Sequence, residues 1–287
     1  MKIAVLADIH SNHIALEKCL EQAKLMGAEV FLFLGDYVGE MPCPEKTLEI
    51  LEAVKKEYPC TFIRGNKEDY WIDHKKGKHF DWIWESGKSS SGMLRYAYDR
   101  LTPAQIDAFE AMPIAKTMEY PDMPSFTICH GSPFQVNESL RPDLPHNDEL
   151  TKRLENRMTI CAHFHQQVEY MKNGKWVINP GSVGMPLYSD GKAQFMMLFD
   201  RGGIWEKEFI SRSYDVEKAI AEMDEERLGI QAPAWYRVTK AVLNGFAVSQ
   251  ARVLDLAFRL CEQAEGKANW KDIPEKYWDM ALNEYGI

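Results

Sequence analysis

Residues 2–12, Lys-Ile-Ala-Val-Leu-Ala-Asp-Ile-His-Ser-Asn, contain a short apolar run that stops at a cluster of polar side chains. Residues 2–7 have the length and composition of a fully buried strand. Residues 12–26 then carry apolar side chains at positions 16, 19, 20, 23 and 26, which is the spacing of one helix face. The stretch therefore predicts a buried strand, a polar turn and a helix.

The same order of elements recurs downstream. Residues 29–34 have the composition of a second buried strand and end at Gly35-Asp36, and residues 60–63 form a third that ends at Gly65-Asn66. Between them, Pro44 begins a helix that is expected to run to about residue 57, since proline is favoured in the first helical turn. Alternation of strands and helices favours a parallel sheet with right-handed crossovers, so we predict an α/β (α+β) fold.

Residues 70–120 interrupt this rhythm. They are rich in aromatic side chains, and their pattern indicates helices, with Thr102-Pro103 as a helix start. The next strand-like segments include a hairpin across Asn173-Gly174. The expected strands are 125–129, 158–162, 167–171, 175–178, 193–199 and 204–210.

From Ser213 to the end the pattern is helical again, and Val253, Ala257, Leu260 and Ala264 form one apolar stripe. Most aromatic side chains of this tail are expected in a core against the rest of the chain. The alternatives are an interface of a homo-oligomer formed through these helices, or a lid over the substrate. The aromatic residues are Trp235, Tyr236, Phe246, Trp270, Tyr277 and Trp278.

Side chains that bind metals stand where the predicted strands end. The carboxyl ends of strands in an open α/β sheet share one edge, where ligands bind, so we expect these side chains to converge there. A single histidine at a strand end is more simply explained as a polar surface residue, and it is the five clusters together that predict a metal site. The predicted ligands are Asp8, His10, Asp36, Asn66, His130, His163 and His165.

The spacing and chemistry of these ligands indicate two metal ions. Asp8 and His10, like His163 and His165, are two residues apart, so both members of a pair face the same way in a continuing strand. Seven ligands exceed the needs of one zinc ion and suit two ions that share a carboxylate, for which Asp36 is well placed. Mixed carboxylate, amide and imidazole ligands favour Mn²⁺, with Fe, Zn²⁺ or Ni²⁺ as alternatives, over Ca²⁺.

The remaining histidines are expected on the surface or in loops. His74 or His79 reaches the metal site only if residues 70–120 fold over it. These histidines are His13, His74, His79 and His146.

Five ordered blocks resemble those of the calcineurin-like metallophosphoesterase superfamily: Asp8-Ile9-His10-Ser11-Asn12, Gly35-Asp36, Gly65-Asn66, His130-Gly131 and His163-Phe164-His165. Asn179-Pro180-Gly181-Ser182 further resembles the small bacterial and archaeal phosphodiesterase branch, and this turn could orient a ligating histidine. The resemblance covers roughly residues 1–200 and implies a four-layer α-β-β-α sandwich of two mixed sheets. We therefore expect a sandwich domain over 1–212, with 70–120 as a helical cap-like insertion, and a helical extension over 213–287 packed on it.

The resemblance also implies how the ligands divide between the ions. One ion would be held by Asp8, His10, Asp36 and His165, and the other by Asp36, Asn66, His130 and His163. The chain departs from the family where a histidine usually follows Asn66, because Lys67 stands there. Ala162 also replaces a usual glycine, a change that adds one methyl group and leaves ligation intact.

The expected reaction is hydrolysis of a phosphomonoester or phosphodiester by a hydroxide that bridges the ions. We assign Asp36, His130 and Lys67 to catalysis. Lys67 acts either as a fixed cation, or as an acid if its surroundings lower its pKa, or only as a phosphate-binding side chain. Asn12 and Arg64 flank ligand blocks and are expected to contact phosphate or to support the ligands.

Composition narrows the remaining choices. The net charge of −9 argues against binding to nucleic acid, and no segment has the length and apolar character to span a membrane. Six cysteines without C-x-x-C spacing indicate free thiols in a reducing, cytoplasmic setting. A small phosphate ester is the expected substrate. The alternatives are a metal-binding scaffold with little turnover that acts through a protein partner, and a protein phosphatase of the same superfamily.

Overall fold

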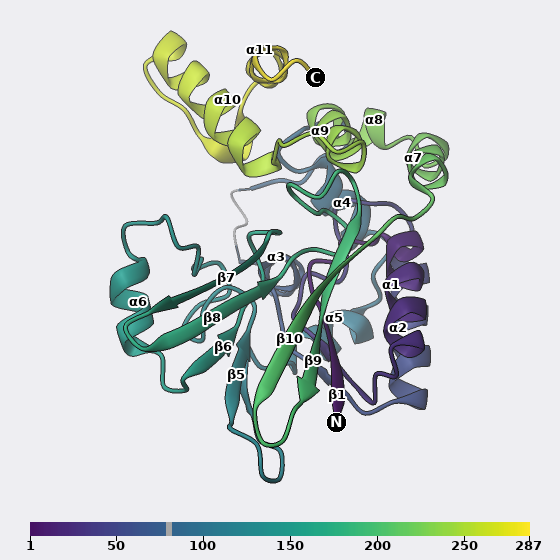
Figure 1. The fold of residues 1–287 in the computed structure, drawn as a ribbon. Coiled ribbons are helices and arrows are strands. Elements are labelled where there is room, and N and C mark those ends of the chain that lie inside the picture. The colour runs from purple at the N-terminus through teal and green to yellow at the C-terminus, as the bar shows by residue number, and fades with distance from the viewer. Residues whose placement is uncertain (79–81) are drawn as a thin grey trace.

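Two five-stranded sheets lie face to face in the computed structural model, which describes residues 1–78 and 82–287 (Figure 1). The first sheet has the order β10-β9-β1-β2-β3, in which β1, β2 and β3 are parallel and β9 is antiparallel to both its neighbours. Its strands are β1 (Lys2–Leu6), β2 (Val30–Phe33), β3 (Cys60–Phe62), β9 (Ala193–Asp200) and β10 (Trp205–Arg212).

The second sheet has the order β4-β5-β6-β8-β7. Its three central strands are parallel, and β4 and β7 are antiparallel at the edges, so both sheets are mixed. Its strands are β4 (Ala115–Met118), β5 (Phe126–Cys129), β6 (Met158–Ile160), β7 (Gln167–Lys172) and β8 (Lys175–Pro180).

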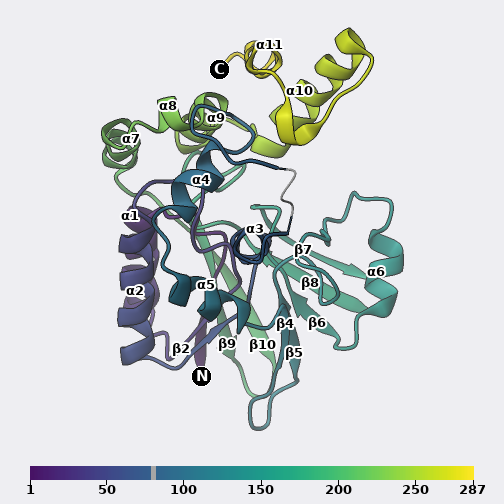
Figure 2. The ribbon, with the colours of Figure 1, turned by 180° about the vertical axis from the view of Figure 1, so that it is seen from behind.

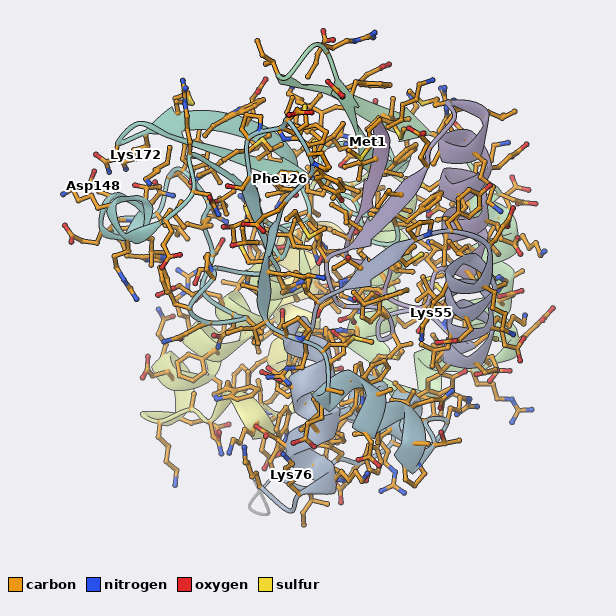
Figure 3. All side chains as sticks on the ribbon, turned by 90° about the horizontal axis from the view of Figure 1, so that it is seen from below. Met1, Lys55, Lys76, Phe126, Asp148 and Lys172 are labelled. Atoms are coloured by element: carbon orange, nitrogen blue, oxygen red, sulfur yellow. The ribbon has the colours of Figure 1, made fainter. Side chains whose placement is uncertain are left out.

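Alternation of side chains along the strands produces four layers. In β1, Ile3 and Val5 pack between the sheets, whereas Ala4 and Leu6 pack against α1 (His13–Leu25) and α2 (Pro44–Glu57). The outer face of the second sheet is covered by α6 (Asn147–Arg153). Viewed from below, Phe126 lies between the sheets, and Lys55 on α2 and Asp148 on α6 lie at opposite sides (Figure 3). The predicted α/β sandwich is confirmed.

The structure differs from the expected elements at residues 115–118. These residues, predicted to be part of a helical insertion, form β4, because Thr117 and its neighbours pair with β5 and extend the second sheet. The insertion therefore has its helices at α3 (Asn66–Lys75), α4 (Gly92–Tyr98) and α5 (Pro103–Glu110). His79 lies outside the described residues. The six cysteines are free, and only Cys60 among them is not buried.

The C-terminal helices form a cluster at one end of the sandwich (Figure 2). Their shared core contacts the sandwich through Ile14, Met41 and Met185. In the longest helix the buried stripe is Val253, Ala257 and Cys261, not the predicted run through Ala264, which is exposed. None of the described helices is long and apolar enough to cross a bilayer. The elements are α7 (Val216–Glu225), α8 (Leu228–Gln231), α9 (Pro233–Leu243), α10 (Gln250–Glu265), η1 (Trp270–Asp272) and α11 (Glu275–Glu284).

The segment before α4 is fastened to this C-terminal cluster by hydrogen bonds. The backbone N–H and hydroxyl of Ser89 both donate to the Glu275 carboxylate, at 2.8 and 2.6 Å. The Trp82 indole and the Ser90 hydroxyl donate to the carbonyl of Lys271, at 3.1 and 2.9 Å. Two parts of the chain almost 200 residues apart thus hold each other at the same end of the sandwich.

The loops after β2 and β3 are joined by the buried carboxylate of Glu68. It accepts backbone N–H groups of Asp36 at 2.9 Å, Tyr37 at 2.9 Å and Gly65 at 2.8 Å. The loops approach so closely that a Cβ at Gly65 would lie 2.3 Å from Asp36 Oδ1, so only glycine fits there. Glu68 therefore fixes the backbone that carries Asp36.

We predict that Glu68→Ala destabilises the fold by about 3 kcal/mol, because three buried N–H donors lose a charged acceptor. Urea unfolding followed by circular dichroism measures the change. Glu17→Ala, at an exposed position of α1, is the matched control and should change stability by less than about 0.5 kcal/mol. Equal unfolding midpoints for the two variants would contradict this role of Glu68.

Candidate metal centre

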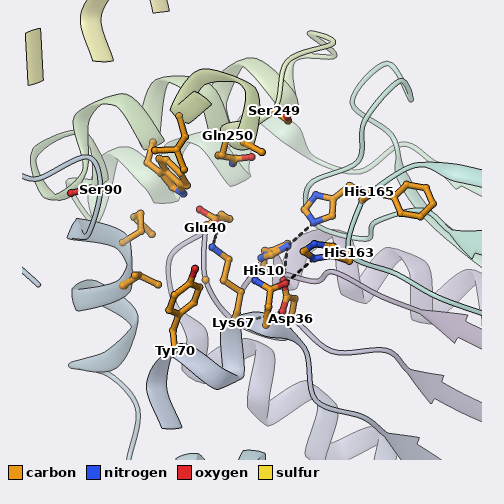
Figure 4. A pocket seen from close by; sticks show the side chains of 18 of the residues that line it. His10, Asp36, Glu40, Lys67, Tyr70, Ser90, His163, His165, Ser249 and Gln250 are labelled. Carbon is orange, nitrogen blue, oxygen red and sulfur yellow. Dashed lines mark hydrogen bonds and ion pairs between the residues drawn. The ribbon is translucent and has the colours of Figure 1, made fainter. Parts of the chain in front are cut away.

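The seven predicted ligands converge at the carboxyl ends of the parallel strands of both sheets. Asp8 and His10 follow β1, Asp36 follows β2 and Asn66 begins α3 after β3. The second sheet contributes His130 after β5, and His163 and His165 after β6. Asp8 and His130 are fully buried, and His10 and Asp36 are almost so. Figure 4 shows His10, Asp36, His163 and His165 pointing toward one another.

The backbone that presents these side chains is not the continuing strand we expected. β1 ends at Leu6 and β6 at Ile160, before any ligand. Instead, five ligands have left-handed backbone: Asp8, His10, Asp36, His163 and His165, with φ between 51° and 75°. Such conformations cost roughly 1–3 kcal/mol for a side chain other than glycine, and they persist where the surroundings fix them. Tight turns, not strand periodicity, therefore aim these groups inward.

One group of ligand atoms surrounds His10. Its Nε2 lies 3.1 Å from His165 Nε2 and 3.7 Å from Asp36 Oδ2, and Asp8 Oδ1 lies 3.6 Å from His165 Nε2. Two nitrogens bound to one ion at about 2.1 Å are themselves separated by about 3.0–3.4 Å. The spacing of the two imidazoles thus suits a common metal ion, and Asp8, His10 and His165 could hold one.

A second group surrounds the side-chain oxygen of Asn66. It lies 3.0 Å from His130 Nε2 and 2.8 Å from His163 Nδ1. His130 Nε2 is also 3.5 Å from Asp36 Oδ1. The two oxygens of Asp36 therefore face different groups, Oδ2 toward His10 and Oδ1 toward His130. This is the arrangement of a carboxylate that can bridge two ions.

Backbone carbonyls set the tautomers of two ligands. His130 Nδ1 donates to the carbonyl of Leu34 at 2.7 Å, and His165 Nδ1 donates to that of Met185 at 2.9 Å. Each ring therefore presents the lone pair of Nε2 to the cluster, as metal-binding histidines do. His10 Nδ1 has no hydrogen-bond partner among the described residues.

The Asn179–Ser182 turn supports the same loops. Asn179 Nδ2 donates to the carbonyl of Ala162 at 2.7 Å, next to His163. The Ser182 hydroxyl donates to the carbonyl of Asp8 at 2.7 Å and accepts the N–H of Met185 at 2.8 Å. The turn thus holds the two loops that carry Asp8, His10, His163 and His165.

Burial makes charge on this cluster costly. It lowers the pKa of His130 to about 4 and, with neighbouring imidazoles, lowers the pKa of His163 and of His165 to about 3. Burial also raises the pKa of Asp8, and the charge of Asp36 raises it further. The imidazoles are therefore neutral and offer lone pairs, while Lys67 is the cation among the described residues that lies near the carboxylates. Divalent cations fit this donor set and relieve the cost of ionising the carboxylates.

Lys67 lies beside the cluster and points across the neighbouring cavity to Glu40, with which it forms an ion pair (Figure 4). Burial lowers the pKa of the Lys67 ammonium, but the carboxylates of Glu40 and Asp36 outweigh this effect and hold it above its usual value. Its backbone N–H donates to Asp36 Oδ1 at 2.8 Å. The side chain is thus a cation paired with Glu40 beside the candidate ligands.

Asn12 and Arg64, expected to contact phosphate or to support the ligands, both bond to neighbouring parts of the chain. Asn12 Oδ1 caps α1 by accepting the N–H of Ala15 at 3.1 Å, and its Nδ2 donates to the carbonyl of Gly184 at 3.1 Å. It therefore supports the loop before Met185. Arg64 turns away to Asp69, at 2.7 Å, and to the carbonyl of Glu110, at 3.0 Å.

The other described histidines lie outside the cluster. His13, predicted at the surface, is buried and bonds Glu222 at 2.7 Å, which joins α1 to α7. His74 stacks on Trp84 with ring centroids 4.0 Å apart. His146 contacts the carbonyl of Ser139 at 3.3 Å.

A cavity of about 360 Å³ opens beside the cluster. It is lined by ligand residues, by the insertion, and by the C-terminal helices through residues such as Trp235, Gln250 and Trp270. The sequence did not identify Glu40, Glu68 or Gln250 as part of the site, and it offered Trp235 and Trp270 only as members of a possible lid. Glu68 follows Lys67 in a noted block, but the roles of Glu40 and the tryptophans depend on tertiary contacts without a local pattern.

Comparison with known proteins identifies the family of this chain. Residues 1–201 match the model of the calcineurin-like phosphoesterase superfamily domain. The uncharacterized protein MJ0912 of Methanocaldococcus jannaschii is 24% identical over 250 residues, which cover 81% of this chain and 94% of that protein.

Solved structures share the fold. A hypothetical protein of Pyrococcus horikoshii, PH1004, superposes with a TM-score of 0.71 at 22% identity, over 86% of this chain and 99% of that one. A metallophosphoesterase of Sphaerobacter thermophilus gives a TM-score of 0.62 at 20% identity, over 82% and 100% of the two chains. The chain therefore belongs to the calcineurin-like phosphoesterase superfamily and is a metal-dependent phosphoesterase.

Proposed function

We propose that the chain hydrolyses a small phosphate ester at a centre of two divalent metal ions, manganese being the favoured metal. The observation that carries the proposal is the position of Asp36, whose two oxygens face two separate groups of ligand atoms. Asp8, His10 and His165 would complete one set, and Asn66, His130 and His163 the other. Two such ions supply an activated water nucleophile and neutralise charge on the phosphate.

The protein's own side chains position the reactants. Asp36 is held by the N–H of Lys67, and the loop beneath it is held by Glu68, so the bridging position is fixed before substrate binds. Lys67 extends into the cavity from the ligand cluster, where its ammonium can face the oxygens of a bound phosphate. With Glu40 as its ion-pair partner, Lys67 would act as a fixed cation beside the phosphate and not as the proton donor for the leaving group.

A small substrate is favoured over a protein by the way in which the site is covered. The C-terminal helices and the insertion line the cavity together and are tied to each other by Ser89 and Glu275. With both segments in place, a small molecule would reach the ligand cluster more easily than the surface of a folded protein would. Residues 213–287 line the cavity through Trp235 and Trp270, and they also form the expected core against the sandwich, which includes Tyr277.

The two-metal proposal predicts manganese-dependent turnover of bis(p-nitrophenyl) phosphate that is lost on chelation and restored by Mn²⁺. Asp36→Asn should bind fewer than two ions per chain and lose at least about 10³-fold in kcat/KM, because the shared ligand is weakened. Metal analysis and the p-nitrophenol assay measure both. Asp148→Asn, on the exposed α6, should retain two ions and full turnover. Full metal occupancy without turnover in the unaltered chain would favour the scaffold role instead.

The assignment of Lys67 predicts a preference for activated esters. Without a proton donor, aryl esters should be hydrolysed about 10²–10⁴-fold faster than alkyl esters of similar size. Lys67→Met should lower kcat by about 10²-fold on both, because a fixed cation stabilises the transition state regardless of the leaving group. Steady-state kinetics on matched aryl and alkyl phosphodiesters give the two ratios. Equal rates in the unaltered chain, or a selective loss on alkyl esters in Lys67→Met, would instead identify Lys67 as an acid.

A further inference from the structure

The cavity beside the ligand cluster has a wall of aromatic side chains. Tyr70 and Trp82 reach it from the insertion, and Trp235, Trp270 and Trp278 reach it from the C-terminal helices. Ring centroids are 5.9 Å apart for Tyr70 and Trp82, 4.8 Å for Trp82 and Trp270, and 5.6 Å for Trp235 and Trp278. The rings thus form two contiguous groups, and the cavity joins both groups to the ligand cluster.

Hydrogen bonds fix two of these indoles. The N–H of Trp82 donates to the carbonyl of Lys271 at 3.1 Å, and that of Trp278 donates to the carbonyl of Ile273 at 3.2 Å. Both are almost fully buried, whereas Trp270 keeps 39% of its surface exposed. Trp82 and Trp278 therefore support the wall from behind, and the ring surface that a ligand can reach belongs to Tyr70, Trp235 and Trp270, which line the cavity and are not buried.

The charged side chains of the lining are already paired. Among the described residues that line the cavity, Lys67 forms an ion pair with Glu40, and Arg141 binds Asp143 with two bonds of 2.6 and 3.0 Å. The wall thus provides no unpaired cation for a second phosphate far from the ligand cluster. A ligand that fits carries its charge at the metal end and an uncharged group at the aromatic end.

We propose that this cavity binds phosphate esters whose ester group carries a planar aromatic ring, either directly on the ester oxygen, as in an aryl ester, or through a sugar, as in a nucleotide. The inference rests on the proposed function, because a phosphate at the ligand cluster is what places its ester group against the indoles. Planar rings stack on indole faces or meet them edge to face, and saturated rings of the same size do so less well.

Non-hydrolysable phosphonates test the ligand class without turnover. Calorimetry on the manganese-loaded full chain should show phenylphosphonate binding about tenfold more tightly than cyclohexylphosphonate, which has similar size but no aromatic face. Methylphosphonate reports the contribution of the phosphonate alone. A thymidine 5′-phosphonate distinguishes the sources: tighter binding than phenylphosphonate indicates a nucleotide, and weaker binding indicates an aryl ester.

Trp270→Ala is the variant that tests the wall, because this side chain is partly exposed and its removal spares the buried core. It should reduce the preference for phenyl over cyclohexyl to about twofold or less. Trp176→Ala is the matched control, since Trp176 lies at the opposite end of β8 from the site and bonds Glu169 at 3.1 Å. It should retain the full preference.

The outcomes separate this inference from the proposed function. Equal affinities for phenyl- and cyclohexylphosphonate in the unaltered chain would overturn the ligand class, even if esters are hydrolysed. An unchanged preference in Trp270→Ala would overturn the role of the wall. A clear ring preference with no turnover of any ester would support the ligand class while contradicting hydrolysis.

Discussion

The cost of burying charge is the constraint on which this structure depends. Four imidazoles, two carboxylates and an amide are gathered at one edge of two sheets, and the carboxylates Asp8 and Asp36 have almost no contact with water. Their raised pKa values and the lowered pKa values of the histidines have the same origin, since low-dielectric surroundings disfavour every charged form. Divalent cations are the partners that such a donor set suits. The left-handed turns that carry these side chains, and the Glu68 carboxylate that accepts the N–H of Asp36, keep the donors close together. They do so despite the free-energy cost of burying charged groups.

The C-terminal helices line the cavity that opens at the edge of the sheets where the candidate ligands meet. The strand ends open into this cavity, which the insertion and the C-terminal helices line together. Lys67 contacts the loop after β2 twice, because its backbone N–H donates to Asp36 Oδ1 and its ammonium pairs with Glu40. The lysine thus places a positive charge beside the candidate ligands.

Much of the sandwich and the convergence of all seven candidate ligands could be predicted from the sequence, because buried strands and the polar residues that end them are local signals. The strand at 115–118 escaped detection since its pairing with β5 is a tertiary contact. The directions of Asp8 and His165 follow from left-handed turns, which spacing alone does not reveal. The direction of the Arg64 side chain is not encoded in its position next to a ligand block either, and the side chain forms an ion pair with Asp69. The aromatic wall joins residues from 70 to 278 and has no motif.

The central claim is that Asp36 bridges two ions, and anomalous diffraction from crystals grown with Mn²⁺ and phosphate tests it most directly. Data collected at the manganese absorption edge should show two peaks about 3.5–4 Å apart, one beside His10 and His165 and one beside His130 and His163, with Asp36 between them. A single peak at saturating Mn²⁺, or peaks away from Asp36, would contradict the account.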